Sequence, residues 1–152
     1  MSFSIRQATV ADTDVIARFN SLMAEETEHI ALDQKRLKKG VTALLSDPSK
    51  GIYYLAEANT TVVGQMMITY EWSDWRNGTF WWIQSVYVEE SARGSGVFRV
   101  LFDHVHSLAR SRNDVCGLRL YVEKSNDRAK RTYARHGMHS SHYEMFEMDF
   151  VL

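Results

Sequence analysis

The sequence predicts an α/β (α+β) domain with one central, mostly antiparallel mixed sheet flanked by about four helices. The chain has 152 residues and 45% of them are hydrophobic, so it is long enough to bury a substantial core. Segments with the two-residue period of strands alternate with segments that have the helical period. No linker, repeat or low-complexity segment interrupts them, so we expect residues 1–152 to form a single domain.

The first third of the chain is expected to hold one strand and two helices. A short strand over 3–6 is followed by a helix that Thr9 or Asp12 caps. A second helix over 34–45 ends before Pro48, because proline disfavours the helical conformation at the residue that precedes it. The first helix turns four apolar side chains inward: Val15, Ile16, Phe19 and Leu22.

Three strands are expected in the middle of the chain. The first two cover 52–58 and 62–72, with an Asn-Thr turn at 59–60 between them. Asn77-Gly78 then marks a hairpin into the third strand, since both residue types tolerate a positive φ.

The last third is expected to hold a strand over 117–123, a helix over 126–136 and a final strand over 143–151. Gly137 closes the helix, because glycine suits the left-handed conformation that follows a helix end. The final strand is predicted from the alternation of apolar and polar residues.

Composition and charge exclude several classes of protein. The formal net charge is −1, which offers no field to attract nucleic acid. No apolar run is long enough to span a membrane, and the N-terminus lacks a signal-peptide core, so we expect no membrane partner. A single cysteine, Cys116, excludes an internal disulfide and gives no metal-ligand spacing. These observations predict a cytoplasmic protein that binds no metal.

The stretch from Trp81 to Phe102 reads as a strand, a glycine-rich turn and the start of a helix. The β-branched and aromatic run suits a buried strand, and Arg-Gly-Ser-Gly at 93–96 ends it. Residues then recur at helical spacing: Val97, Val100, Leu101, His104, Val105 and Leu108. A glycine turn that opens a helix presents backbone N–H groups and the positive end of the helix dipole, so the turn predicts a site for an anion such as phosphate.

This turn resembles the acyl-CoA pyrophosphate loop of GNAT N-acetyltransferases, whose pattern is Arg/Gln-x-x-Gly-x-Gly/Ala. Arg93, Gly96 and Phe98 stand at the matching positions. The family prefers a small residue where Phe98 stands, so its ring either crowds the pyrophosphate or turns into the helix packing. Taken alone, the loop is also compatible with an ordinary glycine turn before a helix.

A second stretch resembles the other GNAT signature, Asn-x-x-Ala-x-x-x-Tyr-x-x-x-Gly. Asn126, Ala129, Tyr133 and Gly137 fall in register with it. The N-terminal strand and helix also resemble the opening element of the family, so the resemblance covers nearly the whole chain. Within this family, the chain distantly resembles the spermidine/spermine acetyltransferases, which act on small-molecule amines.

The resemblance implies a GNAT fold and acetyl-CoA as the cosubstrate. It places the pyrophosphate on the glycine turn, and the backbone of Val86 and Val88 beside the pantetheine amides, as if the cosubstrate were an added strand. It also implies that Asn126 contacts the cosubstrate arm. The cosubstrate-binding residues expected on this basis are Val86, Tyr87, Val88, Arg93, Gly94, Ser95, Gly96, Val97, Phe98, Asn126, Arg128 and Tyr133.

Tyr133 is expected to act as the general acid. Acyl transfer from a thioester to an amine needs a proton for the departing thiolate. A tyrosine pKa near 10 lies above that of a thiol, so a tyrosine can donate to a thiolate and yet stay protonated at pH 7. A buried tyrosine with a purely structural hydroxyl is the alternative, and Asn126, two helical turns earlier on the same face, favours the catalytic role.

The general base is less determined. Polyamine acetyltransferases place a glutamate on the strand before the pyrophosphate loop, and the counterpart here is Gln84, which cannot take a proton but can orient a water molecule. Glu71, Asp74 and Glu25 are the alternatives. Any contribution would be modest, because an amine can also lose its proton to water.

An acidic and aromatic site for the acceptor is expected at the mouth of the cleft. Such a site would favour a cationic amine through cation–π and charge attraction, whereas solvated acidic side chains are the simpler interpretation. The aromatic rim also suits a dimer contact, and we expect a homodimer. The residues expected to converge are Glu25, Glu28, Trp72, Asp74 and Trp75.

Together these features predict an acetyl-CoA-dependent N-acetyltransferase. The acetyl group moves directly, in a ternary complex, to the primary amine of a small molecule. Two alternatives stay open on the same fold: acetylation of a protein lysine or N-terminus, and a non-catalytic acyl-CoA-binding module.

Overall fold

The computed structural model describes residues 2–152. The chain divides into two compact units, the first ending at Leu120 and the second covering Tyr121–Leu152. The expectation that residues 1–152 form a single domain stays a prediction.

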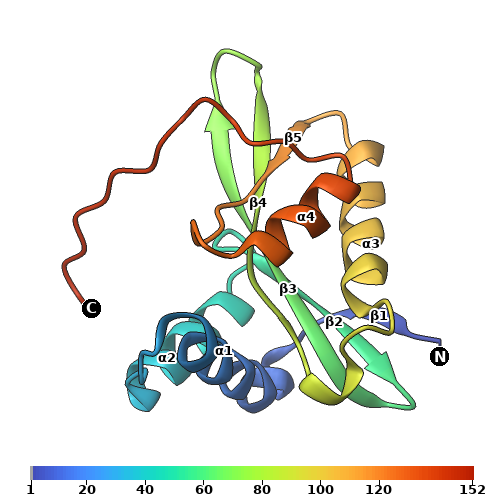
Figure 1. The fold of residues 1–152 in the computed structure, drawn as a ribbon, viewed down its shortest axis with the longest axis vertical. Helices are drawn as coiled ribbons and strands as arrows, with labels where there is room; N and C mark the ends of the chain where they lie inside the picture. Colours follow the sequence, from blue (N-terminus) through green and yellow to red (C-terminus); the bar gives the residue numbers. More distant parts are fainter. Residues whose placement is uncertain (1) are drawn as a thin grey trace. The chain divides into compact units, whose positions relative to one another are not determined.

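The first unit is a five-stranded sheet with three α-helices (Figure 1). The strands lie in the order β1-β2-β3-β4-β5; the first three pairs are antiparallel and β4 pairs with β5 in parallel. The expected mostly antiparallel mixed sheet is confirmed. Its elements are β1 (Ser4–Gln7), the 3-10 turn η1 (Val10–Asp12), α1 (Thr13–Glu28), α2 (Gln34–Leu45), β2 (Ile52–Ala58), β3 (Thr61–Ser73), β4 (Gly78–Val88), the 3-10 turn η2 (Glu90–Ala92), α3 (Val97–Ser111) and β5 (Val115–Arg119).

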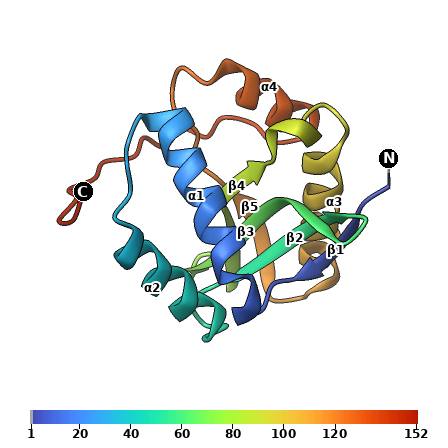
Figure 2. The ribbon, with the colours of Figure 1, turned by 90° about the horizontal axis from the view of Figure 1, so that it is seen from below.

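Different helices cover the two faces of the sheet. Tyr53 of β2 belongs to a buried cluster with Ile16 of α1 and Val41 of α2. The next residue, Tyr54, turns its ring to His104 of α3, with 5.1 Å between the ring centroids. Because neighbouring residues on a strand point to opposite faces, α1 and α2 cover one face, called here the α1/α2 face, and α3 covers the other (Figure 2).

Local sequence signals explain most of the element ends. The Asp33 side chain accepts a hydrogen bond of 2.8 Å from the Arg36 N–H and so caps α2, which has the expected bounds. Asn59 and Thr60 both have a positive φ, of 51° and 67°, as the tight turn between β2 and β3 requires. Of the two residues expected to cap the first helix, Asp12 stands at the N-cap of α1, although its side chain makes no capping hydrogen bond, and Thr9 precedes the 3-10 turn η1.

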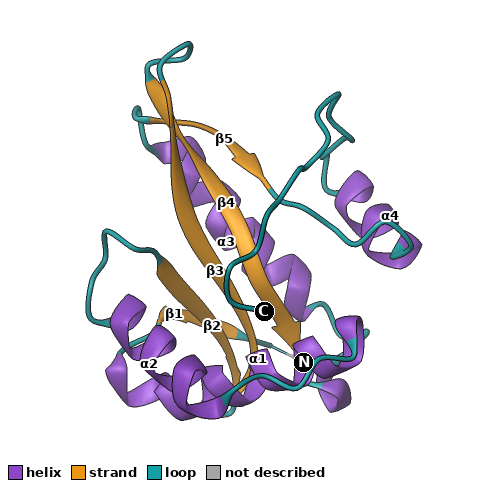
Figure 3. Ribbon diagram, turned by 90° about the vertical axis from the view of Figure 1, so that its left-hand side faces the viewer, coloured by secondary structure: helices purple, strands orange, loops and turns teal. Residues whose placement is uncertain are grey.

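The strands β3 and β4 form the longest hairpin of the sheet. They extend past their neighbours to a turn between Ser73 and Gly78, where Asn77 has φ 48°. The expected Asn-Gly hairpin is therefore confirmed. Figure 3 shows this hairpin projecting away from α1 and α2.

The second unit contains one helix, α4 (Asp127–Arg135). Asn126 caps it by accepting a hydrogen bond of 3.1 Å from the Ala129 N–H, and Gly137 follows it with φ 88°, as expected of the closing residue.

The expected final strand over 143–151 is wrong. These residues alternate as a strand would, but they form no ladder with any part of the described chain. Their side chains are exposed, with Phe146 at 91% and Phe150 at 89%. Alternation fits any extended segment, and only pairing makes it a strand. The strand expected over 117–123 instead ends at Arg119 and begins earlier, at Val115.

Candidate functional site

A β-bulge interrupts β4 at Ser85. Gln65 of β3 pairs with Tyr87 and Met67 pairs with Gln84, so two residues of β4 lie opposite one residue of β3. Ser85 lies in the bulge and has a left-handed backbone conformation, with φ 50°. A bulge bends the strand and changes where the following backbone groups point.

The β5 side of β4 opens just before this bulge. The parallel ladder ends where Trp82 pairs with Arg119. From Ile83 to Val88, β4 therefore has no strand on that side among the residues that the structure describes. An extended chain of amides can join such an edge as an added strand. Val86, Tyr87 and Val88, expected to contact the cosubstrate, all lie on this open segment.

The glycine loop follows β4 directly and opens α3. Gly94 and Gly96 have φ values of 78° and 92°, a region that L side chains rarely adopt. A Cβ built on Gly94 would meet no atom within 4 Å, and one on Gly96 would meet only an Arg99 guanidinium nitrogen, at 3.6 Å. Ser95 closes the turn by donating a hydrogen bond to the Ala92 carbonyl. The loop therefore has open space in front of backbone amides at a helix N-terminus, which fits a diphosphate.

Arg93 connects this loop to α1. Its guanidinium lies 2.8 Å from the Glu26 carboxylate, and its Nε donates a 2.9 Å hydrogen bond to the Val88 carbonyl. The Tyr87 hydroxyl donates to the other oxygen of Glu26, at 3.1 Å, and Arg93 lies over the Tyr87 ring. The hydrogen bond with Glu26 raises the pKa of Arg93; burial, and then Glu26, raise the pKa of Tyr87.

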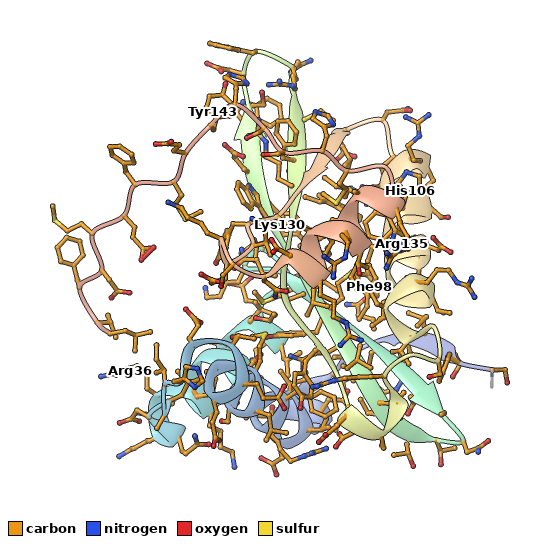
Figure 4. All side chains as sticks on the ribbon, viewed as in Figure 1. Arg36, Phe98, His106, Lys130, Arg135 and Tyr143 are labelled. Atoms are coloured by element: carbon orange, nitrogen blue, oxygen red, sulfur yellow. The ribbon has the colours of Figure 1, made fainter. Side chains whose placement is uncertain are left out.

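Phe98 packs along α3. Its ring stacks on Phe102, one helical turn later, with 5.9 Å between centroids, and Phe102 stacks in turn on His106 at the same distance. Figure 4 labels the two ends of this aromatic row. Of the two orientations expected for the bulky residue, the structure shows the one that turns into the helix packing.

Gln84 and Glu71 both lie on the α1/α2 face, but neither is free to act as a base. Gln84 donates a 2.6 Å hydrogen bond to the Thr69 hydroxyl. Glu71 accepts from the Trp82 indole N–H at 2.9 Å and from Arg119 at 2.8 Å. The bond from Trp82 and then those from Arg119 lower the pKa of Glu71, so it holds a proton poorly.

The structure does not bring together the residues expected to frame a cationic acceptor, and their role in binding the acceptor stays a prediction. Two of them lie at the end of α1, beside Glu26, which contacts the loop end of β4. The other three lie at or beside the hairpin turn, at the opposite end of β4. This strand has 11 residues and is therefore roughly 30 Å long, so the two groups belong to opposite ends of β4. The first group is Glu25 and Glu28; the second is Trp72, Asp74 and Trp75.

A cavity of about 220 Å³ lies on the α1/α2 face. Its polar lining comes from Asn20 of α1 and Tyr53 of β2, and its apolar lining from Met67 and from α2. Met67 pairs with Gln84, the residue before the bulge, so the cavity adjoins the part of β4 where the backbone changes direction.

In the second unit, Asn126, Arg128 and Tyr133 lie on or next to α4. Arg128 is exposed, whereas Tyr133 is half-buried. Burial raises the pKa of the Tyr133 phenol above its usual value of 10, so it keeps its proton at neutral pH.

Sequence reasoning missed four residues around the bulge and one beside the loop. The only signal for the first set is polar side chains at inward positions, and Glu26 lies among other glutamates at the end of α1, where acidic side chains are usually solvated. The missed residues are Asn20, Tyr53, Gln65, Ser85 and Glu26.

The described residues contain no group of three or more His, Cys, Asp or Glu side chains placed to hold a metal ion. No helix in this part of the chain combines the length and the apolar character needed to cross a membrane.

A bulged strand with an open edge, followed by a glycine loop at a helix N-terminus, is the arrangement expected of an acyltransferase that uses an acyl-CoA. The chain belongs to the acetyltransferase (GNAT) family, whose model matches residues 16–138. It is therefore an acetyl-CoA-dependent acetyltransferase, as the two sequence motifs indicate.

Solved structures agree with this assignment. A possible acetyltransferase from Clostridium difficile 630 is 45% identical, with 100% of both chains covered and a TM-score of 0.92. A predicted acetyltransferase with acetyl-CoA from Clostridium acetobutylicum has the same fold, with 18% identity, 99% and 97% coverage and a TM-score of 0.78. An integron cassette protein from the mobile metagenome of V. cholerae is also similar in fold, with 19% identity, 99% and 94% coverage and a TM-score of 0.82. No curated protein matches the chain.

Proposed function

We propose that this enzyme acetylates the primary amine of a small molecule by direct transfer in a ternary complex. The observation that carries the proposal is the cavity of about 220 Å³ next to the bulge of β4. Small-molecule pockets are concave and mostly apolar, with a few polar groups, and this cavity has that character. Its volume lies below the usual range for drug-sized ligands, so an acceptor bound there would have to be small.

In this proposal, the open segment of β4 and the glycine loop hold the cosubstrate. Acetyl-CoA supplies the acetyl thioester when it is bound. The backbone from Val86 to Val88 receives the pantetheine arm, and the amides from Gly94 to Phe98 bind the diphosphate. Asn126 and Arg128 are proposed as further contacts from α4.

Tyr133 is proposed as the general acid. The half-buried phenol holds a proton on Oη throughout the neutral pH range, because burial raises its pKa. Gln84 has an amide that can orient a water molecule, while Glu71 is held by Trp82 and Arg119. We therefore propose that water, rather than a carboxylate of the first unit, takes the proton of the amine.

We also propose that the enzyme works as a cytoplasmic homodimer. Trp75 is 86% exposed and Trp72 is 61% exposed on the projecting hairpin. Exposed tryptophans are typical anchors of protein interfaces, and this supports the hairpin as the dimer contact.

A thiol-release assay over a panel of acceptors tests the function. The panel pairs small primary amines with a lysine-containing peptide and a peptide with a free N-terminus. We expect acetyl-CoA to release thiol fastest with at least one small amine. Faster release with either peptide would support protein acetylation. If none of the acceptors causes thiol release, the result would support a non-catalytic acyl-CoA-binding module.

A further inference from the structure

A buried polar network joins four elements beneath the bulge. The Asn20 amide of α1 donates a 3.0 Å hydrogen bond to the Tyr53 hydroxyl of β2. The Gln65 amide of β3 donates to Asn20 Oδ1 at 2.9 Å and to the Ser85 carbonyl of β4 at 3.0 Å. Ser85 is thus held at its carbonyl, and the network runs from there through Gln65 and Asn20 to Tyr53.

The network lowers the stability of the folded protein, because its polar groups are buried in the apolar core. Gln65 is 0% exposed and Asn20 is 7% exposed, among core residues such as Phe19 and Leu55. Within the described part of the chain, Gln65 Oε1 has no hydrogen-bond partner. A buried polar atom without a partner is unfavourable, and an apolar side chain of the same size would avoid that cost. Packing alone therefore does not explain a glutamine at this position.

The bulge explains why a polar network is needed at this position, because Ser85 has an unusual backbone conformation. Ser85 has φ 50°, which is uncommon for a residue with a side chain and persists only where the surroundings enforce it. The extra residue of a bulge also loses its regular ladder partner, and here Gln65 supplies a donor to its carbonyl. The open segment of β4 begins at the same point, so the conformation of Ser85 sets the direction of Val86 to Val88.

We propose that Gln65 is a positioning residue for acetyl transfer, acting with Asn20 and Tyr53 to hold Ser85 in its left-handed conformation. The inference rests on the proposed placement of the cosubstrate along β4. By fixing Ser85, Gln65 keeps the backbone after the bulge aligned with the thioester, and it touches no substrate itself. Misplacement of reacting groups by about 1 Å costs on the order of a hundredfold in rate, so the effect falls on turnover.

The test compares Gln65→Met with a matched core control, Met66→Leu. Gln65→Met keeps the volume and removes both donated hydrogen bonds, while Met66→Leu changes an equally buried side chain of the opposite face. We expect kcat to fall about tenfold to a hundredfold for Gln65→Met only. The Kd values for CoA and acetyl-CoA, which share the pantetheine arm that β4 would bind, should both rise about twofold to tenfold in Gln65→Met and stay unchanged in Met66→Leu.

Rescue separates positioning from simple support of the core. Glycine adopts a positive φ without strain, so Ser85→Gly in the Gln65→Met background should restore part of kcat. If Gln65→Met does not fold, Tyr53→Phe removes one hydroxyl from the same network and should lower kcat by about twofold to tenfold. An unchanged kcat in a folded variant, or a Gln65→Met defect that Ser85→Gly does not relieve, would overturn the inference.

The two Kd values need no acceptor, so they test the inference even if no amine in the panel is acetylated. If Gln65→Met leaves the Kd for acetyl-CoA unchanged while the wild type acetylates an amine, the result would contradict this inference and leave the proposed function intact. Absence of acetylation by the wild type would contradict the proposed function alone.

Discussion

The carboxylate of Glu26 lies 2.8 Å from the guanidinium of Arg93, the residue that begins the glycine loop. The two side chains are 40% and 37% exposed. A pair so accessible to water contributes about 0–1 kcal/mol to stability, so it is readily exchanged for another partner. In the proposed complex, the diphosphate on the glycine loop would be the new partner of Arg93. Glu26 would then compete with the diphosphate for the Arg93 guanidinium.

Glu26→Gln should tighten the binding of acetyl-CoA. Removing the carboxylate leaves Arg93 available to the diphosphate, and a contribution of this size corresponds to a Kd lower by about twofold to fivefold. Glu90→Gln is the control, because the Glu90 carboxylate acts on Arg93 through charge, while the backbone hydrogen bond from the Arg93 N–H to the Glu90 carbonyl is kept in the variant. Calorimetric titration of both variants measures the difference. A weaker Kd for Glu26→Gln would mean that Glu26 holds Arg93 in place for the ligand.

Gly96→Asp should weaken acetyl-CoA by at least about tenfold. The substitution forces a side chain into a conformation with φ 92° and adds a negative charge in front of the loop amides. Gly96→Ala carries the backbone strain without the charge, so it should weaken binding less. Equal Kd values for Gly96→Asp and wild type would show that the diphosphate binds elsewhere.

Tyr133→Phe should cut kcat by about tenfold to ten-thousandfold, with the melting temperature nearly unchanged. Tyr143→Phe, an exposed tyrosine of the same unit, serves as the control. A rate that Tyr133→Phe leaves unchanged would assign protonation of the thiolate to water or to another group.

The pH dependence provides a separate test of Tyr133. A general acid works in its protonated form, and burial raises the pKa of Tyr133 above 10. Activity due to this group is therefore fully present at neutral pH and is lost only as pH rises through that raised pKa. The alkaline limb of kcat should lie above pH 10 in the wild type and disappear in Tyr133→Phe. A limb in the wild type well below pH 10 would point to a different acid.

Gly40→Leu should raise the KM for the amine. Gly40 of α2 lines the cavity, and a Cβ built there would meet no atom within 4 Å, so a larger side chain has room to enter. The helix itself should become more stable, since glycine in a helix costs about 1 kcal/mol relative to alanine. Gly40→Ala should therefore raise the melting temperature with little change in KM. If Gly40→Leu leaves the KM for the amine unchanged, the acceptor does not bind in this cavity.

The sequence predicted those parts of the fold that short-range signals determine. The Asn-Gly pair at 77–78, the helix over 34–45 and the closing glycine at 137 each depend on residues within a few positions, and all three are confirmed. The alternation over 143–151 failed because a strand also needs a partner, and pairing is a long-range property.

The same distinction applies to the site. The glycine loop is a local feature, so its residues were predicted from the sequence, and Gly94 and Gly96 have the expected positive φ. The contact of Glu26 with Arg93 joins residues 67 positions apart, and that of Gln65 with Asn20 joins residues 45 apart. Such contacts follow from the register of the sheet and the placement of α1, which no periodicity encodes.

The central claim is acetyl transfer from acetyl-CoA to a small primary amine, and one measurement tests it most directly. Isotope-labelled acetyl-CoA is incubated with the enzyme, a mixture of small primary amines and a lysine-containing peptide with a free N-terminus, and the products are identified by mass spectrometry. We expect the label to appear on the nitrogen of a small amine. Label found only on the peptide, or retained entirely on CoA, would contradict it.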